Sequence, residues 1–406
     1  MARSSRTAIV VGGGIGGLTA ALSLRRAGVR VEVFEQAPAL AEIGAGIQLS
    51  PNCARVLHHL GLRPALERIA VRPDALESRH WADGRLLGSY SVNGAPLRYG
   101  APHYLVYRPD LLDVLTGALL TDALLTDAGL TDAGLTDAGP DGVVQLGRQA
   151  AGVYQDDASA TVEFADGGSA TADLVIGADG IHSVIRSALF GDSLPSFSGT
   201  VAYRGRVPAA TVAGLRIPNT STKWWGPVPE HHLVHYPMGG RDRLVNVVGV
   251  VPEQWHTESW TAKGEVSDLA AAFCDFHPPV PELVGALDEV YKFAIYDRAP
   301  LAEWTSGRVT LLGDASHPMV PFMAQGAAMA IEDAAILTRC LTGVADVGDA
   351  LARYSHTRRE RTSRMQSGSR ADTSGSWSAR DWVYGYDAYT VPLAGPLSGP
   401  LSGGSA

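Results

Sequence analysis

Residues 7–35 read TAIVVGGGIGGLTAALSLRRAGVRVEVFE, and the order of elements in this segment indicates the fold class. Thr7–Val11 is a short apolar run, rich in β-branched residues, of the kind that a buried parallel strand requires. After a glycine-rich turn, Leu18–Ala27 carries apolar residues at helical spacing up to Gly28, which suits the end of a helix. Arg30–Phe34 has the pattern of a second strand. The order strand, glycine turn, helix, strand predicts an α/β domain with a parallel sheet.

The turn contains the pattern G-x-G-x-x-G at Gly12, Gly14 and Gly17, and Glu35 stands 21 positions after Gly14. The glycines allow a pyrophosphate to approach a helix N-terminus closely, and the acid can accept a hydrogen bond from a ribose hydroxyl. A glycine-rich turn without a ligand is the alternative, because the glycine pattern alone is weak evidence. The strand, the helix and the acid at matching spacing favour dinucleotide binding, with NAD and FAD both open at this point.

Two later segments repeat the pattern of a strand followed by a turn. Asp173–Ile176 runs into Gly177–Gly180, and Val309–Leu312 runs into the pair Gly313-Asp314. The second of these turns precedes a long stretch with helical character, Gly326–Leu341. The chain therefore begins and ends in α/β units.

The middle of the chain has a different sequence pattern. In residues 196–251, apolar and polar residues alternate in short runs that are separated by turn signals. This pattern predicts antiparallel sheet, and hence a nucleotide-binding domain interrupted by a second domain. We expect the nucleotide-binding domain at 1–70, 101–190 and 299–345, the second domain at 71–100 and 191–298, and a C-terminal helical region at 346–390.

Two segments of biased composition are expected to lie outside the packed domains. Leu119–Gly139 repeats a five-residue unit, which no common solenoid uses, so we expect an expansion in a surface connection. Residues 391–406 repeat Pro-Leu-Ser-Gly, which is typical of a disordered tail.

The composition of the chain excludes several classes of protein. Its 406 residues carry a net charge of -9 with no basic block, which argues against nucleic acid as a partner. The apolar runs are shorter than the roughly 20 residues of a membrane span. Met1–Ser5 lead directly into the first strand, so export is not expected. Cys53, Cys274 and Cys340 are scattered, which suits the cytoplasm and predicts neither disulfides nor a metal site.

Three motifs in order carry a resemblance that spans nearly the whole chain. They are the N-terminal glycine motif, the run GADGIHSVIR at 177–186 and the run GDASHP at 313–318. Together they resemble the motifs of the single-component (group A) FAD-dependent aromatic hydroxylases, whose fold is that of para-hydroxybenzoate hydroxylase. The resemblance implies an FAD-binding domain of the glutathione-reductase type, interrupted by a mostly antiparallel-sheet substrate domain and followed by a C-terminal helical region.

The resemblance also implies which residues contact the cofactor. Besides the N-terminal glycines and Glu35, it assigns Asp179 to the pyrophosphates of FAD and NAD(P)H and Arg108 to the FAD phosphate region. Asp314 would bind the ribityl chain, with Gly313 allowing its close approach. A helix that opens at Gly326 and Ala327 would place its positive end near the flavin ring.

Within this family, the closer likeness is to the salicylate, 3-hydroxybenzoate and 6-hydroxynicotinate hydroxylases. It rests on the runs GAGIQ at 44–48, KWWG at 223–226, MAQG at 323–326 and YGYD at 384–387, and on the pair HW at 80–81. A His-x-x-x-Tyr pair that lines the pocket of that group falls here on His232 and Tyr236. In a strand, this spacing places both side chains on one face, and a histidine is a suitable base for a phenol.

The alternative for His232 is a histidine with only a structural role, since His231 and His235 are close by. Further residues expected in the substrate pocket are Gln48, Tyr203, Trp225 and Phe322. The 6-hydroxynicotinate group carries histidines where this chain has Gln48 and Phe322, which argues against hydroxynicotinate itself.

The implied function is that of a monooxygenase using NAD(P)H and O2. A flavin C4a-hydroperoxide would hydroxylate a small phenolic or hydroxylated heteroaromatic acid, with or without loss of a carboxylate. Only one full dinucleotide motif is present, so NADH or NADPH is expected to bind transiently. A flavin halogenase, a flavin oxidoreductase without oxygen insertion and a non-enzymatic FAD protein are the alternatives. The expected assembly is a monomer or a homodimer.

Overall fold

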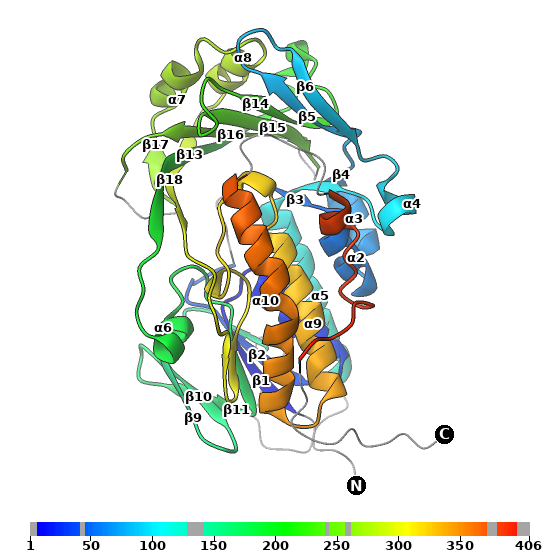
Figure 1. The fold of residues 1–406 in the computed structure, drawn as a ribbon, viewed down its shortest axis with the longest axis vertical. Coiled ribbons are helices and arrows are strands. Elements are labelled where there is room, and N and C mark those ends of the chain that lie inside the picture. Colours follow the sequence, from blue (N-terminus) through cyan, green and yellow to red (C-terminus); the bar gives the residue numbers. More distant parts are fainter. Residues whose placement is uncertain are drawn as a thin grey trace.

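The computed structural model (Figure 1) describes six stretches of the chain, which are residues 6–40, 45–127, 142–239, 243–255, 261–371 and 380–395. Two large sheets form its framework, one in each half of the molecule as drawn. No helix in these stretches combines the length and the apolar character needed to cross a membrane.

The lower half of Figure 1 contains a six-stranded sheet that is parallel except at one edge. Its strands are, in spatial order, β19 (Thr305–Ser306), β20 (Val309–Leu311), β12 (Leu174–Gly177), β1 (Thr7–Val11), β2 (Arg30–Phe34) and β8 (Val144–Gln145). The central strands are buried almost throughout, which explains their continuous apolar sequence.

Helices and a small sheet cover this parallel sheet. The long helices that share its core are α1 (Ile15–Arg26), α5 (Arg108–Asp127), α9 (Gly326–Gly343) and α10 (Val347–Ala371). A three-stranded antiparallel sheet consists of β9 (Ala150–Gln155), β10 (Ala160–Phe164) and β11 (Ser169–Ala172), and α6 (Val184–Phe190) lies beside it.

The upper half of Figure 1 contains an eight-stranded sheet. Its order is β17 (Lys263–Gly264), β18 (Val290–Asp297), β13 (Ser196–Pro208), β16 (Leu244–Pro252), β15 (His232–Met238), β14 (Thr220–Trp225), β5 (Ala75–His80) and β6 (Leu86–Ser91). Every pairing is antiparallel except that of β14 with β5. This arrangement confirms the predicted fold class, whereas the domain boundaries stay predictions.

The remaining elements pack on these two sheets. Helices α7 (Val266–Phe273) and α8 (Val280–Gly285) share an apolar core with one face of the eight-stranded sheet. A small sheet between the two halves consists of β3 (Gly46–Leu49), β7 (Tyr104–Tyr107) and β4 (Ala70–Val71). The remaining short helices are α2 (Pro51–His59), α3 (Arg63–Ile69), α4 (Ala95–Tyr99) and α11 (Arg380–Tyr384).

Two expectations about surface segments are wrong in part. The repeat begins inside α5, with Leu119 and Ala123 buried in the core, so its first residues are packed helix rather than a connection. Residues 128–139 of the repeat lie outside the described stretches. Part of the segment expected to be a disordered tail is packed, because the carbonyls of Val391 and Leu393 accept hydrogen bonds from Arg339 and Arg353. Residues 396–406 also lie outside the described stretches.

Candidate active site

The first element of the site is the glycine turn between β1 and α1. Gly12 has a φ of +109°, and a Cβ atom there would stand 2.3 Å from the carbonyl oxygen of Ala178. A Cβ atom on Gly17 would stand 2.0 Å from the carbonyl oxygen of Gly12. Both positions therefore require glycine. A Cβ atom on Gly14 would meet nothing within 4 Å, so open space adjoins the N-terminus of α1.

Glu35 lies at the open side of this turn. One carboxylate oxygen, Oε2, accepts a hydrogen bond from the N–H of Gly13 at 2.6 Å, and Oε1 accepts from the N–H of Ala37 at 2.8 Å. The acid is thus held beside the space in front of α1. A helix N-terminus, small glycines and an adjacent carboxylate together suit the ADP part of a dinucleotide.

Asp179 forms hydrogen bonds to other residues of its own motif, the run at 177–186. Its carboxylate accepts hydrogen bonds from the hydroxyl of Ser183 at 2.6 Å and from the N–H of Ile185 at 3.1 Å. Burial raises its pKa, and these hydrogen bonds act in the opposite direction. Ser183 in turn accepts from the N–H of Arg186 at 2.9 Å as the N-cap of α6. The structure shows Asp179 shaping this turn, and its contact with a cofactor stays a prediction.

Asp314 follows β20 in the third motif. Gly313 before it has a φ of +64°, and a Cβ atom on Gly326 would lie 3.8 Å from Oδ1 of Asp314. No residue of the described stretches donates a hydrogen bond to this carboxylate, whose side chain opens onto a cavity. Desolvation by the surrounding protein raises the pKa of Asp314, while the positive charges of His317 and Arg108 lower it. A ligand with hydroxyl groups could satisfy this acceptor.

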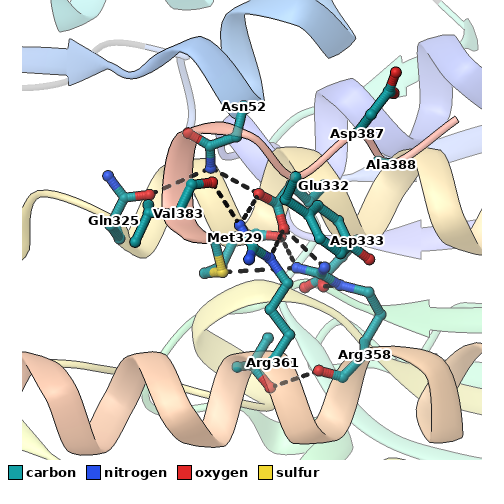
Figure 2. Close-up of polar contacts among 12 residues, drawn as sticks. Asn52, Gln325, Met329, Glu332, Asp333, Arg358, Arg361, Val383, Asp387 and Ala388 are labelled. Carbon is teal, nitrogen blue, oxygen red and sulfur yellow. Dashed lines mark hydrogen bonds and ion pairs between the residues drawn. The ribbon is translucent and has the colours of Figure 1, made fainter. Parts of the chain in front are cut away.

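A buried acid on α9, Asp333, holds the Asp314 turn in place. Figure 2 shows its carboxylate beside Arg358. The carboxylate of Asp333 accepts hydrogen bonds from the N–H of Gly313 at 3.1 Å, from Nε2 of His317 at 2.6 Å and from Nε of Arg358 at 2.7 Å. Burial by itself would raise the pKa of Asp333, but the charges of His317 and Arg358 outweigh it and lower the pKa. Asp333 therefore stays an anion inside the core.

The neighbouring acid, Glu332, faces the C-terminal segment (Figure 2). It accepts hydrogen bonds from Nε of Arg361 at 2.7 Å and from Nδ2 of Asn52 at 2.6 Å. Arg361 also donates to the carbonyls of Trp382 and Val383, at 3.1 and 3.0 Å. Adjacent acids on α9 thus connect the Asp314 turn to residues 380–388.

A cavity with a volume of about 420 Å³ lies between the two halves of the molecule. The eight-stranded sheet supplies one wall, on which alternate residues of β14 and β15 face inward. The opposite wall contains the Asp314 turn and the start of α9. Among the residues around the cavity are Gln48, Arg108, Ser221, Lys223, Trp225, His232, Tyr236, Asp314, Phe322, Gly326 and Ala327.

The imidazole of His232 lines this cavity. Its Nδ1 lies 3.0 Å from the carbonyl oxygen of Pro229, and a carbonyl can only accept, so Nδ1 carries the proton and Nε2 is the free acceptor of the neutral ring. The His232 ring contacts those of Trp225 and Phe322, with centroids 5.6 and 5.3 Å away. Burial first, and then the charge of Lys223, lower the pKa of His232 well below its usual range.

His235 and Tyr236 lie on opposite faces of β15. His235 is buried away from the cavity beside Trp224, with ring centroids 6.4 Å apart, and burial lowers its pKa to about 4. Tyr236 shares the cavity face with His232, and burial raises its pKa, so its hydroxyl remains protonated. Gly46 is needed beside it, because a Cβ atom there would stand 2.6 Å from the hydroxyl oxygen.

The comparisons with known proteins agree with this geometry. The sequence profile of the FAD-binding-domain family matches residues 5–369. The chain belongs to this family. It is 38% identical to 6-hydroxynicotinate 3-monooxygenase of Bordetella bronchiseptica, over 95% of this chain and 96% of that protein. It is 43% identical to a 3-amino-4-hydroxybenzoate 2-monooxygenase of Streptomyces platensis, over 89% of this chain and 86% of that protein.

Two solved structures resemble this member of the FAD-binding-domain family closely. A salicylate hydroxylase in complex with its substrate has a TM-score of 0.77 at 25% identity, covering 95% of this chain and 97% of that one. HpxO of Klebsiella pneumoniae, complexed with FAD and uric acid, has a TM-score of 0.77 at 26% identity, covering 93% of this chain and 92% of that one. The prediction of an FAD-dependent aromatic hydroxylase is confirmed, and so is FAD as its cofactor.

One residue expected in the pocket of this flavoprotein is placed elsewhere. Tyr203 points away from the cavity, and its hydroxyl donates to Glu253 at 2.9 Å. Its ring lies in the apolar core beneath α7 and α8, with the ammonium of Lys292 5.0 Å from its centroid. Successive residues of a strand face opposite sides, and the neighbours Ala202 and Arg204 line the cavity instead. The assignment of Tyr203 to the substrate pocket is wrong.

The structure also shows the partners of Gln48 and adds cavity residues, such as His103 and Ser221, to which the sequence assigned no role. Gln48 donates from Nε2 to the hydroxyl of Ser221 at 3.0 Å and accepts from Nε2 of His103 at 3.2 Å. Burial lowers the pKa of His103 to about 3, so this ring is neutral. Lys223 belongs to the KWWG run, which contributed to the family resemblance. That run did not indicate that the Lys223 side chain points into the cavity. For Arg204, no sequence signal indicated a place in the cavity.

Proposed function

We propose that the protein hydroxylates a small hydroxylated aromatic or heteroaromatic acid, consuming NAD(P)H and O2. One observation carries this proposal: a single cavity connects the turn of Asp314 and Gly326 with the imidazole of His232. The relatives whose names specify hydroxynicotinate and aminohydroxybenzoate support an acid of this kind.

Four parts of the chain would hold FAD. The N-terminal glycines and the start of α1 suit the pyrophosphate, and Glu35 suits the adenosine ribose. Asp314 would accept hydrogen bonds from the ribityl hydroxyls, and Arg108 lies on the same cavity wall with a positive charge. The N-terminus of α9 at Gly326 would face the flavin ring with its positive end. Bound FAD would take a hydride from NAD(P)H and activate O2 for transfer of one oxygen atom to the substrate.

His232 would act on the ring hydroxyl of the substrate. Because Nδ1–H donates to the carbonyl of Pro229, Nε2 presents its lone pair toward the cavity. Its lowered pKa keeps the ring neutral at neutral pH, so the acceptor is always available. Withdrawing the proton of the hydroxyl raises the electron density of the ring at the ortho and para positions, where oxygen is added.

Tyr236 and the aromatic walls would orient the substrate. The protonated hydroxyl of Tyr236 can donate a hydrogen bond to the substrate from the same strand face as His232. Trp225 and Phe322 offer ring faces and edges on either side of His232 and exclude water from its neighbourhood.

The first test is a screen with isotopic oxygen. The purified FAD-loaded protein is mixed with NADH or NADPH and with 3-hydroxybenzoate, 3-amino-4-hydroxybenzoate, salicylate or 6-hydroxynicotinate. We expect at least one acid to stimulate NAD(P)H oxidation and to yield a product with one ¹⁸O atom from ¹⁸O2 by mass spectrometry. Product without ¹⁸O would favour an oxidoreductase that inserts no oxygen, and chloride-dependent product would favour a halogenase.

The second test compares two histidines of one strand. His232→Ala should retain FAD and its reduction by NAD(P)H but lose hydroxylation by about 10²–10⁴, as expected for a general base. Hydrogen peroxide should rise relative to hydroxylated product. His235→Ala, the matched control on the opposite face of β15, should keep the ratio of product to NAD(P)H oxidised. If His235→Ala alone abolishes hydroxylation, the base is assigned to the wrong residue.

We also propose that the reaction takes place in the cytoplasm, where NAD(P)H is available. The three unpaired cysteines Cys53, Cys274 and Cys340 support this proposal.

A further inference from the structure

A lysine stands beside the histidine of the cavity. Lys223 lies on β14 opposite Val234 of β15, and both residues line the cavity. Cross-strand partners share one face of a sheet, and diagonal neighbours on it are about 7–8 Å apart at Cα. Val234 is the residue between His232 and Tyr236 on this face, so Lys223 stands next to both.

The side chain of Lys223 reaches the aromatic residues around His232. Its Nζ atom lies 3.7 Å from the ring centroid of Trp225 and 5.6 Å from that of Phe322. Both rings also contact the imidazole of His232. The lysine charge lowers the pKa of His232, which shows that its field reaches the proposed base.

The charges on the sheet wall of the cavity are unequal. Lys223 and Arg204 are cations on this wall, and Arg204 lies over the ring of Phe293, 4.1 Å from its centroid. The acid on the same wall, Glu77, is paired with Arg79 at 2.8 Å. A substrate lying against this wall therefore meets the side chains of two cations.

We propose that Lys223 binds the carboxylate of the substrate while His232 accepts from its ring hydroxyl, so that Lys223 determines the preference for acids over neutral phenols. The inference rests on the proposed function and names the residue responsible for its specificity. A carboxylate that leaves water for an apolar cavity is costly unless a cation pairs with it. The ammonium of Lys223, held against the rings of Trp225 and Phe322, supplies this cation.

The test measures binding rather than turnover. Isothermal titration of the FAD-loaded enzyme compares 3-hydroxybenzoate with 3-hydroxybenzamide, and 6-hydroxynicotinate with its amide. In Lys223→Met, which keeps a similar chain length, the Kd of the acids should rise about 10- to 100-fold, in keeping with a hydrogen bond to a charged group. The Kd of the amides should change by less than about threefold. Lys263→Met removes a charge from the exposed pair with Glu289 and should change neither.

Two further results decide between a binding role and a structural one. Lys223→Arg keeps the charge and should restore most of the preference for acids, with FAD content unchanged. Equal losses for acid and amide, or a loss of acid binding in Arg204→Met but not in Lys223→Met, would overturn the assignment. Either result can occur while the wild-type enzyme still hydroxylates acids, so the proposed function would stand. If no aromatic acid is hydroxylated in the isotopic screen, it is the proposed function that fails.

Discussion

Replacing Arg358 by methionine tests whether the buried acids of α9 hold the flavin site. The guanidinium is fully buried and lies 2.7 Å from Oδ1 of Asp333 and 2.7 Å from Oε2 of Glu332. Without it, Asp333 keeps the imidazole of His317 and the N–H of Gly313 as hydrogen-bond partners, and Glu332 keeps Arg361. Removing one partner of a buried ion pair costs about 3–5 kcal/mol, because the remaining charge is left without full compensation. We expect a loss of about 3 kcal/mol in the free energy of unfolding.

The assay is urea unfolding of the FAD-loaded protein, followed by tryptophan fluorescence, with flavin absorbance measured after gel filtration. Because Asp333 also holds Gly313 and His317, Arg358→Met should lose FAD at lower urea concentrations than those that unfold the chain. Arg359→Met, on the next residue of the same helix, breaks a partly exposed pair with Glu303 and a hydrogen bond to the carbonyl of Ala302, and should have a much smaller effect. An unchanged midpoint and unchanged flavin content in Arg358→Met would refute this reasoning.

Three further predictions follow from residues described above. Asp314→Ala should retain the fold but lose most of its FAD on gel filtration, since the carboxylate that faces the cavity is gone; normal flavin occupancy would contradict its assigned role. The pKa values of Glu332 and Asp333 are lowered in the folded protein, so their stabilisation is complete above their unfolded pKa of about 4 and is lost as the pH falls through the folded values. The urea concentration at the unfolding midpoint should therefore decrease when the pH is lowered below about 4. Between pH 5 and 7, these two acids should change it little. Leu119→Ala should lower the free energy of unfolding by about 2–5 kcal/mol because the side chain is fully buried in α5, whereas a surface connection would tolerate the change in a melting experiment.

The sequence predicted those parts of the site that depend on local backbone geometry. The glycine turn and the Gly313-Asp314 turn each need particular residues at fixed spacing after a strand, so the pattern itself indicates the structure. The four-residue spacing of His232 and Tyr236 placed both on one strand face, and the structure has them there.

What the sequence did not predict depends on contacts between distant segments. Alternation along β13 separates Tyr203 from its neighbours, but both faces of this strand are covered, so the pattern cannot say which face meets the cavity. The ion pairs of Glu332 and Asp333 join α9 to residues about 25 to 29 positions away, with no spacing rule to reveal them. The first residues of the repeat, up to Asp127, continue α5 as helix because leucine and alanine favour helix whatever the period of the unit.

The parallel pairing of β5 with β14 has a consequence for synthesis of the chain. The hairpin of β5 and β6 ends at Ser91, whereas its partner strand begins only at Thr220. At about 5–20 residues per second, the ribosome needs roughly 6 to 26 s to make the intervening stretch. During this interval the hairpin has an unpaired strand edge, which is a template for association between nascent chains. A chaperone that shields this edge should therefore matter more for the yield of native protein than one that acts after release.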